Sequence, residues 1–345
     1  MKSINKVVAV VLRLALVACS GGNKPKQAES VPSAETKVAP AKVNDEAQKL
    51  LKYLEETGDY VNGRNFPSLI KASAVHKELD GKLRIIDLRN TGAFVKGHIK
   101  GAVNIEFSQI PNYFTNVIKP FEFDKIVLVC SDGQISSYAT SLLRLMGYGN
   151  VYAMRWGMSS WNNDFAKDSW FYNVSSKFED KLELTENQSK FTSDFPQMNT
   201  GKSTGEEIMA ARFNSVFAAG SSDIFITADE VFANPANYFT MNYERKDKYD
   251  AGHIPGSIRY KPNGTLGILT EMETIPSDKS VIVYCGTGHN SGFITAYLRL
   301  FGYNAKTLIY GNNAFMYDKM VKDKTLLSWL PFTDADVEKF TYVKN

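Results

Sequence analysis

Two cysteines carry the clearest potential for chemistry, because each follows an apolar segment and precedes a loop that contains glycine. Cys130 lies in KIVLVCSDGQISS and Cys285 in SVIVYCGTGHNSG. A cysteine in such a place could be packing, half of a disulfide, a metal ligand or a nucleophile. The 345 residues contain three cysteines and no C-x-x-C or paired Cys/His spacing, so neither a disulfide framework nor a zinc site is expected. A chemical role for the thiols is favoured over accidental burial.

The two cysteine segments belong to an internal repeat. His98 precedes Cys130 in FVKGHIKGAVNI, and His253 precedes Cys285 in YDAGHIPGSIRY. Both pairs are 155 positions apart (285 − 130 and 253 − 98), and the glycine after each LRL segment has the same offset. A common spacing across three landmarks predicts that the body of the protein is two copies of one domain.

Alternation of strand and helix signals indicates the fold class. In the first copy we expect strands at 84–89, 125–130 and 151–156, and helices at 73–79, from Ser136 or Ser137 to Met146, and from about 157. Fully apolar strands that alternate with helices are typical of parallel α/β sheets buried on both faces. The sequence therefore predicts two tandem α/β domains, each with a central parallel sheet flanked by helices.

The loop after Cys285 has the composition of an anion cradle. A parallel strand would deliver Cys285 to the carboxyl edge of its sheet, where open α/β folds bind ligands. Gly286 and Gly288 would let the backbone curl round the sulfur with its amides inward, and a helix opening near Ser291 would add its positive end. Such surroundings predict a thiol of lowered pKa that is substantially ionised.

The segment IIDLRNTGAFVKGHIKGAVNI, followed by a strand that ends in C-x-x-G-x-x-S, resembles the rhodanese superfamily of sulfurtransferases. The resemblance covers about residues 60–165 and 220–320. It implies that a cysteine accepts a sulfane sulfur as a persulfide and passes it to an acceptor. The C-G-T-G pattern of the second loop is most similar to the mercaptopyruvate branch and to exported multi-domain relatives.

Loop charge ranks the two cysteines. Asp132 lies inside the first loop, where a carboxylate would oppose a thiolate and repel an anionic donor. The second loop contains no acid, and His289 could become cationic in mild acid. We therefore expect Cys285 to be the nucleophile, with Cys130 as the second candidate. The expected donor-binding residues of the second loop are Gly286, Thr287, Gly288, His289, Asn290 and Ser291.

The family's D-x-R arginine, which often binds the anionic donor, gives the opposite ranking. The first repeat contains it as Asp87 and Arg89. At the same offset the second repeat has Asn242 and Glu244, with Arg245 next. Either Arg245 substitutes for the missing arginine or donor binding differs there, and partial activity of both repeats stays open.

His98 and His253 are expected to be structural. Both lie well before the cysteine strand, and loop histidines commonly hydrogen-bond the backbone.

The N-terminal residues have the pattern of a secretory signal and predict that the protein is exported. Lys2 and Lys6 precede an apolar run too short to span a bilayer, and this run ends in LVAC at Cys19, which resembles the lipobox of bacterial lipoproteins. The resemblance implies lipidation of Cys19. Arg13 within the run argues against insertion, and the alternative is an uncleaved amphipathic N-terminus of a cytosolic protein. Residues 20–43 are poor in large apolar side chains and are predicted to form a tether.

The expected organisation follows from these signals. It comprises a signal peptide at 1–19, a flexible tether at 20–48, a first domain at 49–170, a linker at 171–215 and a second domain at 216–345. Part of the linker should pack on a domain because it is long. We expect a lipid-anchored protein of the bacterial cell envelope, facing the periplasm.

Composition and spacing restrict the function. The net charge of +3 does not indicate a nucleic-acid partner. Phosphatases and arsenate reductases of related fold need an arginine six residues after the cysteine, where this chain has Ser136 and Ser291. The favoured function is transfer of sulfur from thiosulfate or mercaptopyruvate to a thiol, cyanide or protein, with no metal or organic cofactor. The alternative is a non-catalytic binding scaffold.

Overall fold

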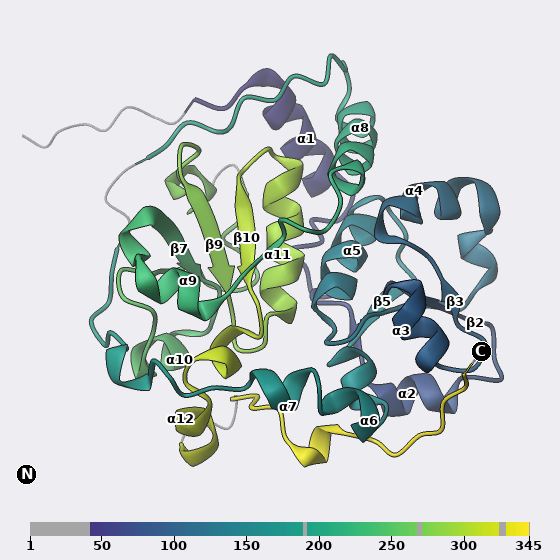
Figure 1. The fold of residues 1–345 in the computed structure, drawn as a ribbon. Coiled ribbons are helices and arrows are strands. Elements are labelled where there is room, and N and C mark those ends of the chain that lie inside the picture. The colour runs from purple at the N-terminus through teal and green to yellow at the C-terminus, as the bar shows by residue number, and fades with distance from the viewer. Residues whose placement is uncertain (1–41, 189–191, 268–270, 324–328, 345) are drawn as a thin grey trace, which may run out of the picture. The chain divides into compact units, whose positions relative to one another are not determined.

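Two five-stranded parallel sheets organise the computed structural model, which describes residues 42–188, 192–267, 271–323 and 329–344 (Figure 1). The strand orders are β1-β5-β4-β2-β3 and β6-β10-β9-β7-β8. The strands of the first sheet are β1 Leu69–Ile70, β2 Leu83–Asp87, β3 Val103–Asn104, β4 Lys125–Val129 and β5 Val151–Met154. Those of the second are β6 Phe225–Ile226, β7 Tyr238–Asn242, β8 Ile258–Arg259, β9 Ser280–Tyr284 and β10 Ala305–Leu308.

The strands that precede the cysteines lie at the centre of their sheets. In β4 and β9 every residue after the first is buried, which matches their apolar sequences. β4 pairs with β2 and β5, and β9 pairs in parallel with β7 and β10. The α/β fold with two parallel-sheet domains, predicted from the repeat, is therefore confirmed.

The helices along the two repeats are α2 Ala72–Lys77, α3 Thr91–Lys96, α4 Ile110–Asn112, α5 Gln134–Leu145, α6 Asn163–Ala166 and α7 Trp170–Asn173, then α9 Ala228–Ala233, α10 Lys246–Ala251, α11 His289–Leu300 and α12 Tyr317–Lys322. Four helices of the first repeat, α2, α3, α5 and α6, have counterparts in the second repeat, α9, α10, α11 and α12. The segment from residue 157, predicted as helical, forms a 3₁₀ turn before α6.

The helices after the two cysteines begin earlier than the sequence indicates. α5 begins at Gln134 rather than at a serine cap, and α11 begins at His289 rather than near Ser291. Gly133 and Gly288 occupy the N-cap position with φ of +89° and +79°. Because glycine adopts this left-handed conformation without a Cβ penalty, the chain turns from loop to helix two residues sooner.

The two repeats meet through their cysteine helices. α5 packs against α11, and the Ser141 hydroxyl donates to the Phe293 carbonyl at 2.8 Å. Gly292 lets the helices approach closely, since a Cβ there would lie 3.2 Å from the Gln134 carbonyl oxygen. Leu142 of α5 and Phe293 of α11 belong to one continuous apolar core. The loops at the start of both helices are therefore neighbours.

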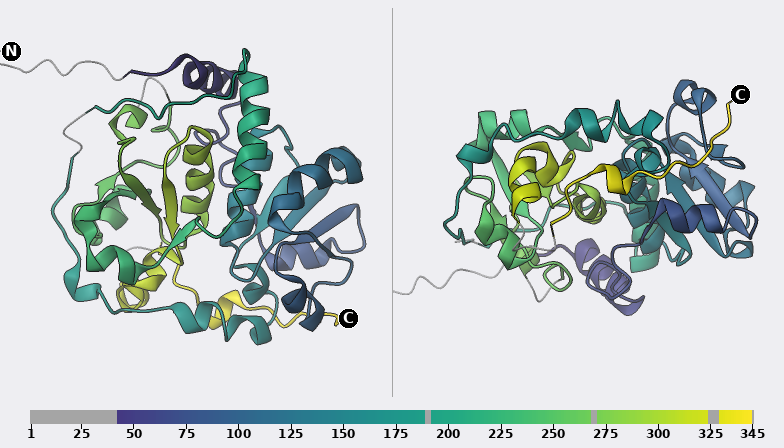
Figure 2. Two further views of the ribbon diagram at one scale, coloured as in Figure 1. Left: turned by 45° about the horizontal axis from the view of Figure 1, so that its top comes forward. Right: turned by 90° about the horizontal axis from the view of Figure 1, so that it is seen from below.

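Segments outside the repeats also tie the body together. α1 Asp45–Glu56 and α8 Gly205–Ala218 pack against each other (Figure 2). α1 thus begins within the span predicted as tether, and α8 lies in the predicted linker, where Thr204 and Glu207 form a capping box. The C-terminal segment leaves the second repeat and runs along the first, where Val343 pairs with His98 (Figures 1 and 2).

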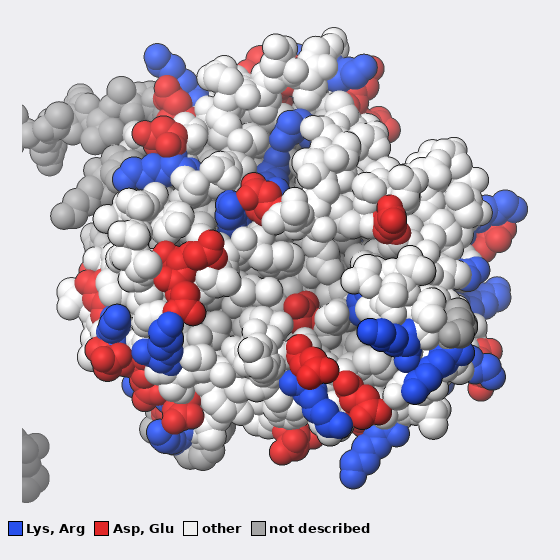
Figure 3. All heavy atoms as spheres, viewed as in Figure 1, with Lys and Arg blue, Asp and Glu red and all other residues white. Residues whose placement is uncertain are grey.

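The predicted signal peptide and Cys19 lie outside the described residues. Within the described ranges, the helices are all too short or too polar for a bilayer span. On the face drawn in Figure 3, basic and acidic side chains are interspersed rather than gathered into one basic field.

Candidate active site

The loop after β9 surrounds the sulfur of Cys285. The Ser291 amide donates to Cys285 Sγ at 3.4 Å, and the Ser291 hydroxyl lies 3.7 Å from the same sulfur. The positive φ of Gly288 brings the first turn of α11 directly over the thiol. A sulfur anion at this position would receive an amide hydrogen bond and the positive end of the helix.

The loop after β4 is built in the same way but contains an acid. The Gly133 amide donates to Cys130 Sγ at 3.1 Å, and the Ser136 hydroxyl lies 3.5 Å from it. The Cys130 thiol also contacts Asp132 Oδ1 at 3.4 Å. Burial, and then the Asp132 charge, raise the pKa of Cys130 to about 12. The first repeat therefore holds its sulfur as a neutral thiol.

A glycine next to each cysteine loop allows the backbone to approach the carbonyl of that cysteine closely. The Met158 amide donates to the Cys130 carbonyl at 2.8 Å, and the Asn312 amide donates to that of Cys285 at 3.0 Å. Gly157 and Gly311, which precede these amides, have φ of +57° and +55°. A Cβ on Gly311 would lie 2.1 Å from the Cys285 carbonyl oxygen, so a larger residue would push the loop away.

The two loops interlock across the repeats. The Trp156 amide donates to His289 Nε2 at 3.1 Å, and in the mirrored contact the Tyr310 amide donates to Gln134 Oε1 at 2.7 Å. Because Nε2 accepts, the proton of the neutral ring is on Nδ1, which donates to Thr287 Oγ1 at 2.8 Å. His289 is therefore a contact between the repeats.

The expectation that His289 becomes cationic in mild acid is wrong. Burial, followed by repulsion from Arg155, lowers the pKa of His289 to about 3. The ring of Trp170 also stacks on the imidazole, with the centroids 5.8 Å apart. The imidazole therefore stays neutral at ordinary pH, and any attraction of an anion must come from other residues.

Cys285 lines a cavity of about 210 Å³. The residue itself is only 3% exposed, and this cavity gives a small molecule access to it. Of the expected donor-binding residues, Gly286, Thr287 and Asn290 line the cavity, whereas Gly288, His289 and Ser291 support the loop. The complete lining is Pro67, Leu69, Arg155, Glu244, Lys248, Cys285, Gly286, Thr287, Asn290 and Leu330.

The prediction of a lowered thiol pKa is also wrong. Burial, and then the charge of Glu244, raise the pKa of Cys285. Glu244 follows β7 and reaches the loop so closely that a Cβ on Gly286 would lie 2.8 Å from its Oε1. Glu244 is ion-paired with Lys248 at 3.0 Å, and both side chains are buried. The second loop contains no acid in sequence, but the fold supplies one.

The two arginines expected to bind the donor are engaged elsewhere. Arg89 is buried and bidentate on Asp87, at 2.6 Å for the shortest contact, and it also donates to the Gly97 carbonyl. The Arg245 side chain is 68% exposed and pairs with Asp247. Arg245 lines a separate surface cavity of about 390 Å³. Neither arginine belongs to the lining of the Cys285 cavity.

Sequence reasoning missed the cations that do line this cavity. Lys248 lies one helical turn after Glu244, and Arg155 follows β5 of the other repeat. The offset of 155 did place Glu244 where the first repeat has Arg89, but it gave no sign that this carboxylate reaches the Cys285 loop. No local signal marks Arg155, because only the packing of the repeats brings it to Cys285.

The two motif histidines have the structural role that was predicted. His98 Nδ1 hydrogen-bonds the Phe94 carbonyl at 2.9 Å, and His253 Nδ1 hydrogen-bonds the Tyr249 carbonyl at 2.8 Å. Each imidazole also stacks on the ring of that aromatic residue. Across the described residues, no group of three or more His, Cys, Asp or Glu side chains is placed to hold a metal ion.

This combination of parallel sheets and cysteine loops defines an α/β domain with a thiol in an anion cradle. The rhodanese-like domain family matches residues 71–164 and 242–318. The thiosulfate sulfurtransferase GlpE of Shewanella oneidensis is 31% identical over 81 residues, which cover 23% of this chain and 76% of that protein. The chain belongs to the rhodanese-like family.

In two further comparisons, less than half of the other protein is matched. A tRNA uridine(34) hydroxylase of Teredinibacter turnerae is 30% identical over 82 residues, which are 23% of this chain and 26% of that protein. The chain thus spans about a quarter of that relative's length. The match to the crystal structure of a thiosulfate sulfurtransferase from Pseudomonas aeruginosa covers 86% of this chain and 49% of that one. The identity is 14% and the TM-score is 0.27.

Proposed function

We propose that the protein is a sulfurtransferase in which Cys285 carries the sulfur. Family membership and the likeness to a sulfurtransferase support sulfur transfer in general. The observation that carries the assignment to Cys285 is its position at the end of a central strand, under the Ser291 amide and facing a cavity. The donors proposed are thiosulfate and mercaptopyruvate.

The proposed reaction has two steps. The Cys285 thiolate attacks the outer sulfur of thiosulfate, the donor S–S bond breaks, and sulfite leaves with the electron pair. With mercaptopyruvate the C–S bond breaks instead, and the resulting enolate takes up a proton. An acceptor thiolate then attacks the outer sulfur of the persulfide and releases the Cys285 thiolate.

The charges around the cavity fit an anionic donor. Arg155 and Lys248 contribute two cations and Glu244 one carboxylate, so the lining is net positive. The Ser291 amide donates to Cys285 Sγ and would stabilise the thiolate, both when it attacks the donor and when the acceptor releases it. The raised pKa of Cys285 means that attack requires the thiol to lose its proton when the donor binds.

The test is a donor panel on the wild type and on each single cysteine variant. We expect Cys285→Ser to lose at least about 100-fold in transfer rate, because the nucleophile is gone. Cys130→Ser should keep most of the activity, since Asp132 contacts the Cys130 thiol at 3.4 Å and would repel an anionic donor there. If Cys130→Ser is the inactive variant, the first repeat carries the sulfur. If no donor in the panel is turned over, the protein acts as a scaffold.

We also propose that the chain is lipidated at Cys19 and faces the periplasm from the bacterial cell envelope. The proposal rests on the LVAC segment and on the tether-like composition of the residues that follow. The acceptor would then be a thiol or a protein of that compartment.

A further inference from the structure

Arg155 belongs to the first repeat but lines the cavity of the cysteine in the second. It follows β5, and its amide donates to the Ile70 carbonyl at 2.9 Å, which fixes its backbone in the first sheet. Its side chain lines the 210 Å³ cavity of Cys285 and also a neighbouring cavity of about 300 Å³. Leu330 is the other residue common to both cavities. Arg155 therefore lies where the two cavities meet.

Within the part of the chain that the structure describes, the guanidinium of Arg155 makes no hydrogen bond or ion pair. The hydrogen bonds of Arg155 are made by its backbone: its amide donates to the Ile70 carbonyl and its carbonyl accepts from the Ser160 hydroxyl at 2.9 Å. Burial nevertheless removes enough water to lower its pKa. A partly desolvated cation without a hydrogen-bonded ion-pair partner is costly, and binding an anion would relieve that cost.

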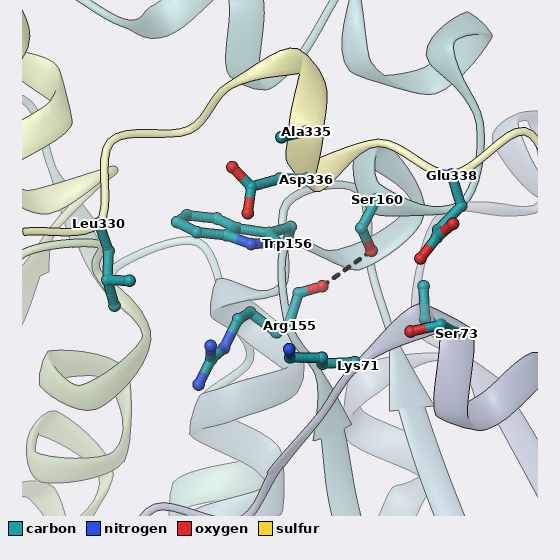
Figure 4. Close-up of a pocket in the computed structure, with 10 residues that line it drawn as sticks. Lys71, Ser73, Arg155, Trp156, Ser160, Leu330, Ala335, Asp336 and Glu338 are labelled. Carbon is teal, nitrogen blue, oxygen red and sulfur yellow. Dashed lines mark hydrogen bonds between the residues drawn. The ribbon is translucent and has the colours of Figure 1, made fainter. Parts of the chain in front are cut away.

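The other cations near Cys285 are already compensated. Lys248 is held at 3.0 Å from Glu244, and Arg245 pairs with Asp247 outside the cavity. The carboxylate that bears most on Arg155 is Asp336, whose Oδ2 accepts from the amide and the hydroxyl of Thr333. Figure 4 draws Asp336 on one side of the Trp156 ring and the Arg155 guanidinium on the other. Asp336 therefore acts on Arg155 from a distance, and among the described residues Arg155 is the cation of the cavity lining that no ion pair engages.

We propose that Arg155 binds the anionic group of the sulfur donor while Cys285 receives its outer sulfur. This inference rests on the proposed function and makes the donor site a composite of both repeats. The planar guanidinium can donate two parallel hydrogen bonds to a carboxylate or to the oxygens of thiosulfate. The family arginine that the second repeat lacks is replaced from the first repeat rather than by the neighbouring Arg245.

The kinetic test compares Arg155→Gln with a matched control, Arg245→Gln. Initial rates are measured with thiosulfate or mercaptopyruvate as donor and the uncharged thiol dithiothreitol as acceptor. In Arg155→Gln we expect kcat/KM for either donor to fall about 10- to 100-fold, the value of a lost charge-assisted hydrogen bond, with kcat/KM for dithiothreitol unchanged. Arg155→Lys should recover part of the loss. Arg245→Gln should behave as the wild type.

A binding measurement separates this inference from the proposed function. Thiosulfate is titrated calorimetrically into the Cys285→Ser protein, which cannot turn over, and into the Cys285→Ser, Arg155→Gln double variant. We expect the double variant to bind at least about 10-fold more weakly. Such a result would support the anion site even if the wild type transferred no sulfur.

Three outcomes would overturn the inference. Equal thiosulfate binding by the single and double variants would remove Arg155 from the site. Equal losses in kcat/KM for donor and acceptor, together with a lowered melting temperature, would make its role structural. A donor defect in Arg245→Gln without one in Arg155→Gln would restore the sequence-based expectation.

Discussion

At the residue scale, Glu244 controls the state of the thiol. It stands where the first repeat has Arg89, and its charge raises the pKa of Cys285. Replacing it by glutamine removes the opposing charge and frees Lys248, so the thiolate fraction below the pKa should increase. We expect Glu244→Gln to accelerate iodoacetamide labelling of Cys285 about 3- to 10-fold near pH 7.5.

The matched control for this variant is Asp132→Asn, which should accelerate labelling of Cys130 instead. Peptide mass spectrometry distinguishes the two sites in one digest. Unchanged or slower labelling of Cys285 in Glu244→Gln would show that this carboxylate does not set the reactivity of the thiol.

His289 should make stability depend on pH. Its folded-state pKa of about 3 lies below the unfolded value of about 6.5, so folding favours the neutral ring. That contribution is complete above pH 6.5 and is lost as the pH falls towards 3, at up to about 1.4 kcal/mol per pH unit. His289→Gln, which copies Gln134 of the first repeat, should flatten the decline between pH 7 and pH 5. Urea unfolding at three pH values measures it, and an unchanged slope would contradict the assignment.

Residue chemistry was predictable only where it is local. The cysteine and its glycine loop follow from a short stretch of sequence, and so do the structural histidines. The expected low pKa of Cys285 is not found because burial and Glu244, a residue of another element, outweigh the amides of Thr287 and Ser291. Arg155 could not have been predicted, since its place at the site depends on how two repeats pack.

At the scale of elements, the parallel strands and their order of appearance follow from apolar runs, whereas the starts of α5 and α11 do not. Starts at Ser136 or Ser137 and near Ser291 were expected, but left-handed glycines occupy the N-cap positions of both helices. The glycines after β5 and β10 were not recognised at all. Their role is visible only in the folded structure, because a Cβ at either glycine would clash with the carbonyl oxygen of the cysteine in the adjacent loop.

Gly311→Ala should therefore disrupt the cysteine loop. Its φ of +55° and a Cβ 2.1 Å from the Cys285 carbonyl oxygen combine backbone strain with a clash. We expect a loss of about 2–4 kcal/mol in the free energy of unfolding, and most of the transfer activity with it. Gly147→Ala is the control: its φ is +95° but nothing lies within 4 Å of a Cβ, so it should cost about 1–2 kcal/mol and keep activity. Equal effects of the two would contradict this account.

At the scale of the whole molecule, segments outside the repeats connect them, and the sequence repeat does not predict these contacts. The C-terminal segment returns to the first repeat, where the Trp161 indole donates to the Thr341 carbonyl at 2.8 Å. Glu183, beyond the first repeat, pairs instead with His253 of the second. The repeat predicted two domains. The contacts of the C-terminal segment and of Glu183 depend on long-range packing and leave no pattern in the sequence.

The proposed anchor is also a property of the whole chain. In a bacterial host fed a labelled fatty acid, the wild type should incorporate label and fractionate with membranes, because a lipidated Cys19 would hold the body there. Cys19→Ser should incorporate none. Absence of label in the wild type would contradict the envelope location.

The central claim is that Cys285 carries the transferred sulfur, and peptide mass after exposure to a donor tests it most directly. The protein is incubated with thiosulfate, freed of excess donor and digested without reductant. We expect the peptide containing Cys285 to gain the mass of one sulfur atom and to lose it when a thiol is added. Sulfur found only on the Cys130 peptide, or on neither, would contradict the account.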